Sequence, residues 1–569
     1  MASNFVPFTA FKPDLTTLGT DSSSVVSGVV PRGDGFGPFK SFQAFTQALP
    51  AACRGFFFAR NTDGSIAVFA GTSTDLYKLD NTSFIWVRVS KGGVSYGTLV
   101  ASDNWRFAQF ETFVIAVQLN TVPQKFVLGS SSAFGDLGGS PPQASHIAIV
   151  NGFVLLTGLL SNPQRAQWSD LFGPETWAAG TGLADFQDFP DGGICHQCSG
   201  GDAYGVVFQD DAIRTLTYAP GSAVVFQIAR ISTQDTLFAQ YSVINAGTRT
   251  FFISAQGFKV IVAGGEPISI GKEQVDRFFF GDVDANNLQL IIGAADPTAT
   301  RVYWAYKSQQ GSAGLFDKLL CFDWSVKDRP WTLIPMSGQY LGYLAKPGLT
   351  LEGLDAIAPG GLTVLGAASG TAGRIRLQLD AVSNANFTIA GQNFIELQGV
   401  TPSYMNGSWP PIAVDSTHIE LGGSTFAAAW VSGGRIGGSL DALTFSLDSI
   451  STSAVSALSM VGPSSTLGFF TGPNIEAILE TPEINEDSFV FIDGMTPFTD
   501  SPDALGSIGH RNQAQGAITY TGETAVNSRG DCPQNVEAQF LKARLRVPAG
   551  SVWTYARGIE PNIQAAGDT

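Results

Sequence analysis

Cys195 and Cys198 form the most chemically suggestive pair in the sequence, because two cysteines three residues apart can supply half of a zinc site. No second Cys-x-x-Cys or His-x-x-x-His pair completes such a site, and His146, His418 and His510 are scattered. A redox role would need a helix N-terminus to acidify the first thiol, and no helical pattern surrounds the pair. The sequence therefore favours two small buried thiols over a metal or redox centre.

The segment DVDAN at 282–286 resembles the start of a calcium-binding loop. Asn287 stands at the sixth loop position, where such loops need Gly, and Gly293 stands at the twelfth, where a bidentate Glu is required. The segment therefore predicts a turn in which Asp and Asn side chains cap backbone amides.

Paired carboxylates occur as Asp210 with Asp211 and as Glu480 with Glu483. Such pairs are common in turns, and neighbours on a strand point to opposite faces. The sequence holds no Gly-x-Ser-x-Gly, Walker or His-Glu-x-x-His motif, and the Asp-Gly-Ser at 63–65 is not the repeated Asp box of sialidase propellers. We predict that the chain is not an enzyme, needs no cofactor, and has no catalytic, cofactor-binding or metal-binding residues.

Short runs of Val, Ile, Phe and Tyr alternate with clusters of Gly, Ser, Asp and Pro along almost the whole chain, which indicates strands and turns. Asn151-Gly152 and Gln256-Gly257 lie where a tight hairpin needs a residue with positive φ. Units closed by an aromatic residue recur about every 43–53 residues, a spacing typical of four-stranded propeller blades. The closing residues are Trp86, Phe134, Trp177, Phe226, Phe278 and Trp331. We predict about six blades over residues 46–340.

The predicted fold is all-β: a β-propeller with an inserted small β domain and a C-terminal β domain. Residues 1–45, rich in Gly, Pro and Ser, should form an extended N-terminal arm, and the propeller should occupy 46–360. Residues 361–438 should form a small inserted β module. Residues 439–569 should hold the remaining propeller strands and the C-terminal β domain.

The inserted module is predicted from its own strand pattern and from its surroundings. Its expected strands are RIRLQLD, FTIAGQ, NFIELQGV, THIELGG and AAAWVSGG. Two similar pieces, at 351–357 and 438–450, flank it. Folded scaffolds accept such insertions in surface loops.

The 569 residues carry a formal net charge of −16 and only 14% charged residues. A phosphate-gripping protein needs clustered Lys and Arg, so this composition argues against one. Five cysteines in so long a chain favour free thiols in a reducing compartment. The N-terminus lacks the basic and apolar regions of a secretory signal, and no apolar stretch reaches the roughly 18–20 residues of a membrane helix. We expect a chain folded in a cytoplasm, without a membrane-spanning segment.

Several stretches, in a fixed order, resemble the hub or nozzle proteins of short-tailed bacteriophages, also called packaged-DNA stabilisation proteins. They are VVPRGDGFGPFKSF (29–42), WRFAQFETFVIAV (105–117), NPQRAQWSD with PETW and DFQDFPDGG (162–193), AYGVVFQDDAIRTLTY (203–218), FFISAQGFKVI with PISIGKEQVDRFFF (251–280), WAYKS, CFDWSVKDRPW, and RGDCPQNVEAQFLKARLRVPAGSVWTYARGIE (529–560). The resemblance covers most of the chain outside 361–438, and that segment is similar to a small β module of several phage tail proteins.

This resemblance implies a structural virion protein that forms a ring, expected to be a hexamer, below the portal and adaptor. The ring extends the DNA channel, retains packaged DNA and guides its ejection. The implied partners are the head-to-tail adaptor, tail fibres or spikes, and a tail tip or plug protein. The implied location is the virion tail, assembled in the host cytoplasm.

DNA is expected to pass through this channel without tight binding, because a net negative chain repels phosphate on average. An alternative reading is a tail adhesin that binds a host surface glycan. A secreted propeller enzyme is disfavoured by the missing signal and motifs.

Overall fold

The structure is a computed structural model of the chain, and it describes residues 5–81, 84–345, 362–380, 382, 389, 395–437 and 456–565. The chain divides into two compact units. Unit 1 comprises Met1–Leu79, Ile85–Ala345 and Ser456–Thr569, and unit 2 comprises Asp80–Phe84 and Lys346–Val455.

Nearly all of the regular structure is β, so the all-β prediction is confirmed. The helices of the described residues are short: α1 (Asp276–Asp282) and the 3-10 turns η1 (Lys91–Gly93), η2 (Gln240–Ser242), η3 (Leu288–Leu290), η4 (Thr371–Gly373) and η5 (Ser403–Met405). None of the helices in the described ranges is long and apolar enough to cross a membrane.

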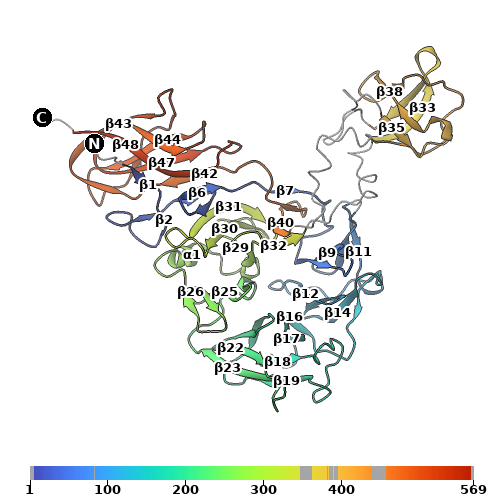
Figure 1. Cartoon of the computed structure of the whole chain (residues 1–569), viewed down its shortest axis with the longest axis horizontal. Helices are drawn as coiled ribbons and strands as arrows, with labels where there is room; N and C mark the ends of the chain where they lie inside the picture. Colours follow the sequence, from blue (N-terminus) through green and yellow to red (C-terminus); the bar gives the residue numbers. More distant parts are fainter. Residues whose placement is uncertain are drawn as a thin grey trace. The chain divides into compact units, whose positions relative to one another are not determined.

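Six antiparallel four-stranded blades follow one another in unit 1, as predicted for residues 46–340 (Figure 1). Blade 1 consists of β8 (Phe56–Arg60), β9 (Ile66–Gly71), β10 (Leu76–Leu79) and β11 (Trp86–Arg88). Blade 2 consists of β12 (Arg106–Phe110), β13 (Phe113–Gln118), β14 (Thr121–Val127) and β15 (Gly135–Asp136). Blade 3 consists of β16 (Ala144–Val150), β17 (Phe153–Leu159), β18 (Arg165–Trp168) and β19 (Asp185–Asp188). Blade 4 consists of β20 (Cys195–Ser199), β21 (Gly205–Gln209), β22 (Ile213–Tyr218) and β23 (Phe226–Ser232). Blade 5 consists of β24 (Ile244–Ala246), β25 (Arg249–Ser254), β26 (Gly257–Val262) and β27 (Ile268–Ser269). Blade 6 consists of β28 (Ile292–Ala295), β29 (Arg301–Tyr306), β30 (Phe316–Asp323) and β31 (Trp331–Gly338).

The predicted hairpin turns explain how local sequence builds these blades. Val150 pairs with Phe153 across the turn Asn151-Gly152, and both turn residues have positive φ, at 48° and 85°. In the second hairpin Ser254 pairs with Gly257, so the turn residues are Ala255 and Gln256, and the positive φ of 125° lies at Gly257, the first residue of β26. The turn at Asn151-Gly152 matches the twist of the strands that it joins. Both hairpins form between adjacent segments of the chain.

A further four-stranded sheet, here called the closing sheet, is assembled from distant segments. Its strands are β32 (Tyr340–Ala345), β40 (Ser456–Val461), β41 (Leu467–Phe469) and β7 (Gln43–Ala44). Its first strand, β32, contacts β28 of blade 6 and β8 of blade 1, so the sheet completes the circle of blades. Strand β7 comes from the N-terminal arm, which therefore helps to close the propeller.

Each junction between consecutive blades has its own apolar core. Phe69 of blade 1 packs on Phe126 of blade 2 with ring centroids 5.0 Å apart, and Phe208 of blade 4 packs on Phe252 of blade 5 at 5.0 Å. The largest cluster surrounds Trp304 and Trp331 of blade 6, whose rings stack at 5.8 Å. The blades are thus held by neighbour-to-neighbour packing, which needs no shared sequence motif.

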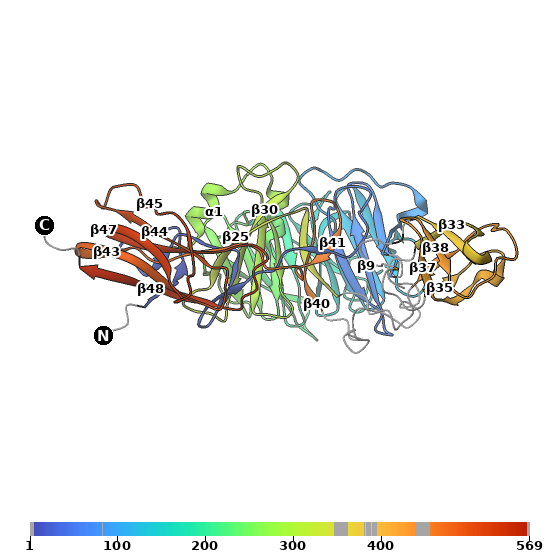
Figure 2. The same ribbon diagram turned by 90° about the horizontal axis from the view of Figure 1, so that it is seen from above.

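The C-terminal strands, labelled in Figure 2, form one sheet with strands of the N-terminal arm. The order β4 (Val26–Ser27), β42 (Ala477–Glu480), β47 (Cys532–Val547), β43 (Ile484–Thr499), β48 (Ala556–Ala565), β6 (Gly35–Pro38), β5 (Val29–Arg32) continues from β31 of blade 6. Strand β44 (Leu505–Arg511) pairs with β47, β45 (Thr519–Tyr520) and β46 (Thr524–Ala525), β1 (Val6–Pro7) pairs with β48, and β2 (Ala10–Phe11) pairs with β3 (Ser22–Ser23).

Unit 2 contains a small β-barrel. Its strand order is β36 (Gly407–Trp409), β35 (Ile395–Gln398), β39 (Arg435–Gly437), β33 (Leu362–Ser369), β34 (Ile375–Leu379), β38 (His418–Leu421), β37 (Pro411–Ala413). The two end strands, β36 and β37, are separated in the chain by Pro410 alone, so the sheet must curl until its ends meet. The barrel encloses its own apolar core, which includes Leu377, Leu397 and Ile419.

Three of the five strands expected in the module match β34, β35 and β38. The strand expected at AAAWVSGG is wrong, because the extended segment begins later, at Arg435, and residues 427–434 contribute only a bridge between Ser432 and Thr401. Two glycines with positive φ, Gly433 and Gly434, interrupt the strand there. The expected strand FTIAGQ (apart from Ile389) and the flanks 351–357 and 438–450 lie outside the described residues.

Candidate functional site

The Cys195 and Cys198 thiols both point into the apolar core between blades 3 and 4. Residues three apart on a regular strand face opposite sides, but a β-bulge between Cys195 and Gln197 shifts the register and turns both thiols to one side. Burial raises the pKa of each thiol to about 12. His196 points elsewhere, and its Nε2 lies 2.5 Å from Asp210 Oδ1. The motif therefore acts as core packing in this fold.

All five cysteines are free and buried, and we expect them to be unreactive in the folded protein. Burial raises the pKa of Cys53 and Cys321 to about 12 and that of Cys532 to about 11, so the nucleophilic thiolate is scarce at pH 8. A chromogenic disulfide reagent should titrate no thiol within minutes in native buffer and five in denaturant. Rapid native labelling of any cysteine would contradict this.

The calcium-like segment is a capped turn in which each acidic residue is paired with a different lysine. Asp282 accepts hydrogen bonds from Lys318 at 2.7 Å and Tyr306 at 2.9 Å. Asp284 accepts from Lys307 at 2.9 Å and from the backbone amide of Asn286 at 3.0 Å. Among the residues that the structure describes, no group of three His, Cys, Asp or Glu side chains is arranged to hold a metal ion.

The carboxylates singled out in the sequence also lie in separate ion pairs. Glu480 and Glu483 do not act as a pair: Lys542 binds Glu480 at 2.6 Å, whereas Arg511 binds Glu483 at 2.6 Å. Asp210 accepts hydrogen bonds from His196 and from the amide of Ile194. The hydrogen bonds to His196 and Ile194 hold the pKa of Asp210 below its usual value against the opposing effect of burial.

The structure instead brings together a different set of residues, at the axis of the propeller. The innermost strands of the six blades and of the closing sheet surround a cavity of about 430 Å³. Aromatic rings form much of its wall: Phe57 stacks on Phe107 with centroids 5.9 Å apart and planes at 9°, and Phe56 meets Tyr340 at 5.6 Å. Such a volume and such walls are typical of small-molecule pockets.

A layer of buried polar groups lies beside this cavity. Arg54 Nε donates to Asn104 Oδ1 at 3.0 Å, and the backbone amide of Asn104 donates to the Tyr241 hydroxyl at 2.8 Å. The carbonyl oxygen of Gln240 accepts a hydrogen bond from Gln197 at 2.9 Å. These bonds join the segment before blade 1 to the segment before blade 2, and they join both the segment before blade 2 and blade 4 to the turn that precedes blade 5.

Arg106, the first residue of β12, is one of the residues that line the cavity. Its guanidinium lies 4.8 Å from the centre of the Tyr241 ring and close to the Tyr340 hydroxyl. Nearby His146 is fully buried, and burial, assisted by the charge of Arg106, lowers its pKa to about 3, so that the imidazole is neutral. Arg106 is not predicted from the sequence, where the available signal is one arginine between Trp105 and Phe107 at the start of an apolar strand.

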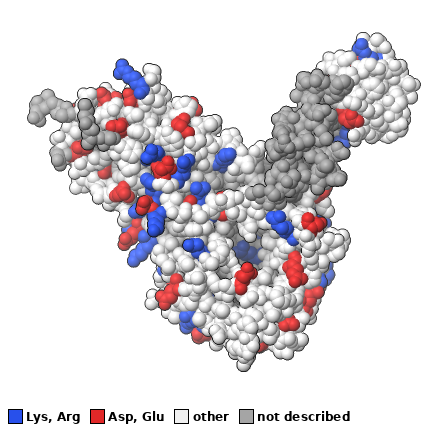
Figure 3. All heavy atoms as spheres, in the orientation of Figure 1, with Lys and Arg blue, Asp and Glu red and all other residues white. Residues whose placement is uncertain are grey.

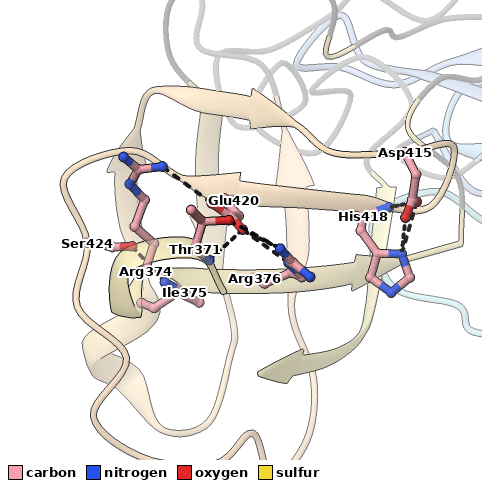
Figure 4. Close-up of polar contacts among 8 residues, drawn as sticks. All are labelled: Thr371, Arg374, Ile375, Arg376, Asp415, His418, Glu420 and Ser424. Atoms are coloured by element: carbon pink, nitrogen blue, oxygen red, sulfur yellow. Dashed lines mark hydrogen bonds and ion pairs between the residues drawn. The ribbon is translucent and has the colours of Figure 1, made fainter. Parts of the chain in front are cut away.

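The barrel of unit 2 has a polar cluster of its own, shown in Figure 4. The buried carboxylate of Glu420 accepts hydrogen bonds from the amide of Thr371 at 2.8 Å and from Arg376 at 2.7 Å, and Arg374 lies 3.4 Å away. In the turn between β37 and β38, Asp415 accepts hydrogen bonds from the backbone amide and the ring of His418 at 2.8 and 2.9 Å. Both groups fasten loops to β38, so they stabilise the barrel.

Glu420 should make the barrel sensitive to acid. Hydrogen bonds from Thr371 and Arg376 lower its pKa from the usual 4.5 to about 2. Because the folded-state pKa is depressed, this stabilisation is complete above about pH 4.5 and is lost as the pH falls toward 2. Hydrogen exchange of residues 375–379 and 418–421, corrected for intrinsic rates, should rise over this window. Glu420→Gln should exchange faster at neutral pH with a flatter profile; an equally steep profile would exclude Glu420 as the cause.

No known protein family and no curated protein matches the sequence. Similar solved structures include a functionally unknown protein from Desulfotomaculum acetoxidans DSM 771, at 14% identity and a TM-score of 0.34 over 54% of this chain and 95% of that chain. The Pan2 WD40 domain of Neurospora crassa is similar at 8% identity and a TM-score of 0.33 over 56% of this chain and 90% of that chain. The class of the protein, a β-propeller, follows from its own sheets.

Proposed function

We propose that the chain is a structural, non-enzymatic subunit of a phage tail nozzle or hub ring, in which six copies extend the DNA channel below the portal and adaptor. Its proposed partners are the adaptor, tail fibres or spikes, and a tail tip or plug, and its place is the virion tail. The ordered motifs of the sequence support this proposal, since they run from the N-terminal arm through the blades to the C-terminal sheet.

The observation that carries the proposal is that the chain neutralises many of its own cations. Arg165 lies 2.7 Å from Asp188, Lys91 lies 2.5 Å from Asp136, and Arg546 lies 2.5 Å from Glu523. Figure 3 shows wide uncharged areas on the face in view, with acidic residues scattered over it and basic residues gathered beside acidic ones near its middle. A wall past which DNA slides must not hold phosphates, because several phosphate contacts together bind DNA tightly.

The axial cavity of one propeller is far too small to be the proposed channel. Its volume of about 430 Å³ suits a small molecule. A DNA duplex is much wider, since its major groove alone measures about 12 Å across. In this proposal DNA therefore passes through the centre of the ring, between subunits.

Weak DNA binding is the expected behaviour of such a wall. At physiological salt we expect an apparent Kd no tighter than about 10⁻⁴ M for a random duplex, the weak end of non-specific binding. A gel-shift titration measures it. Sub-micromolar affinity that falls steeply with added salt would reveal a phosphate-gripping surface and would contradict the proposal.

Class averages of the purified protein by negative-stain electron microscopy test the assembly itself. Closed rings with a central hole wide enough for a duplex are the expected result, and adding the adaptor should increase their fraction. Slender trimers would favour the alternative, a tail adhesin that binds a host glycan. A chain that stays monomeric with the adaptor present would contradict the ring.

A further inference from the structure

The axial cavity carries a feature that channel function does not require, namely a cation without a carboxylate partner. Within the part of the chain that the structure describes, Arg106 is the one charged side chain of the cavity wall, and no Asp or Glu lines it. An arginine stays protonated at any pH at which the protein folds. The described wall of the cavity therefore holds one cationic side chain and no anionic one.

Three other buried or partly buried arginines of unit 1 are each paired with a carboxylate. Arg214 lies 2.6 Å from Asp191, Arg301 lies 3.0 Å from Asp323, and Arg511 lies 2.6 Å from Glu483. Arg106 has instead the Tyr241 ring and the Tyr340 hydroxyl as neighbours, and none of the Asp or Glu residues that the structure describes lines the cavity beside it. A half-buried guanidinium of this kind gains most from an oxyanion that it can bind through two parallel hydrogen bonds.

The walls indicate what else such a ligand contains. The stacked pair Phe57 and Phe107 and the pairs Phe56 with Tyr340 and Phe58 with Tyr343 (centroids 5.7 Å apart) present flat apolar surfaces around the cavity. Aromatic faces and edges pack well against planar groups. The volume of about 430 Å³ limits the ligand to a small molecule.

We propose that the axial cavity binds a small organic anion, with its carboxylate or phosphate oxygens on Arg106 and its planar apolar body between the aromatic side chains. This site does not depend on the proposed function, because it belongs to a single propeller and needs no ring.

Isothermal titration calorimetry of the full chain with matched probes tests this site. Benzoate and phenyl phosphate should each bind one molecule per chain, and the stronger of the two identifies carboxylate or phosphate as the preferred group. Inorganic phosphate, which lacks the ring, should bind more weakly than phenyl phosphate. Benzylamine, which keeps the ring and reverses the charge, should not bind at millimolar concentration. Equal binding of benzylamine and benzoate, or no binding of either aromatic anion, would overturn the proposal without any variant.

Two variants locate the binding. Arg106→Gln should weaken the stronger anion at least about tenfold, the loss expected when a charge-assisted hydrogen bond is removed. Arg249→Gln is the matched control, since Arg249 also lies over an aromatic ring, Trp324, at 5.9 Å, but outside the cavity. Unchanged affinity in Arg106→Gln, or an equal loss in both variants, would overturn the assignment to Arg106.

Discussion

Replacing Glu480 by Ala is expected to cost about 3–5 kcal/mol of folding stability, because it leaves the buried Lys542 and the partly buried Arg544 without their partner. The Glu480 side chain is 1% exposed, and it binds Lys542 and Arg544 at 2.6 Å each and the Tyr520 hydroxyl at 2.6 Å. Lys542 is itself only 7% exposed. Despite burial, these partners hold the pKa of Glu480 below its usual value. Urea unfolding followed by tryptophan fluorescence measures the loss.

Glu476→Ala is the control for this prediction. Glu476 lies one residue before β42, and its partner Arg546 is at 3.0 Å, but its side chain is 46% exposed and Arg546 keeps Glu523. Exposed ion pairs contribute about 0–1 kcal/mol, so this variant should be nearly as stable as the wild type. Equal losses in the two variants would mean that burial of the Glu480 cluster has no particular role.

The second large effect is expected at Gly28, where the N-terminal arm contacts both blade 6 and the C-terminal sheet. Its amide donates to Leu333 of β31 at 2.9 Å, and its φ is +73°. A Cβ at this position would lie 1.9 Å from the carbonyl oxygen of Glu476, so Gly28→Ala must separate β4 from the C-terminal sheet locally. We expect a loss of about 1–2 kcal/mol from the left-handed backbone, plus about 1–3 kcal/mol from overpacking.

Gly19→Ala separates these two contributions. Gly19 has nearly the same φ, +71°, but nothing within 4 Å of the position of a Cβ. It should therefore lose only the backbone part, about 1–2 kcal/mol. The thermal midpoints of both variants measure the difference, and equal shifts would show that the close approach at Glu476 relaxes without cost.

The six consecutive blades were predictable because each is built from neighbouring hairpins. Trp86, Phe226 and Trp331 begin the outer strands β11, β23 and β31, which is why their spacing followed the blades. The spacing was less informative at Phe278, which lies half-buried in helix α1 while its neighbour Phe279 fills the core.

The closing sheet could not be predicted from a repeat in the sequence. Its strands come from residues 43–44, 340–345 and 456–469, so no contiguous repeat marks it. Pairing between such distant segments is decided by the closure of the whole ring of blades, a tertiary effect that local patterns do not contain.

The candidate site shows the same limit of local patterns. The sequence drew attention to Cys195 and Cys198, yet a bulge placed them in the core. It gave no reason to choose Arg106, because the significance of that residue depends on which side chains six other sheets bring to the axis.

The proposed structural ring in a phage tail is tested by electron microscopy of phage particles that contain this chain, labelled with an antibody against it. We predict label confined to the tail, in a collar around the channel below the portal and adaptor, and none along slender fibres. Label at fibre tips, or particles that carry no label while the chain accumulates elsewhere, would contradict the claim.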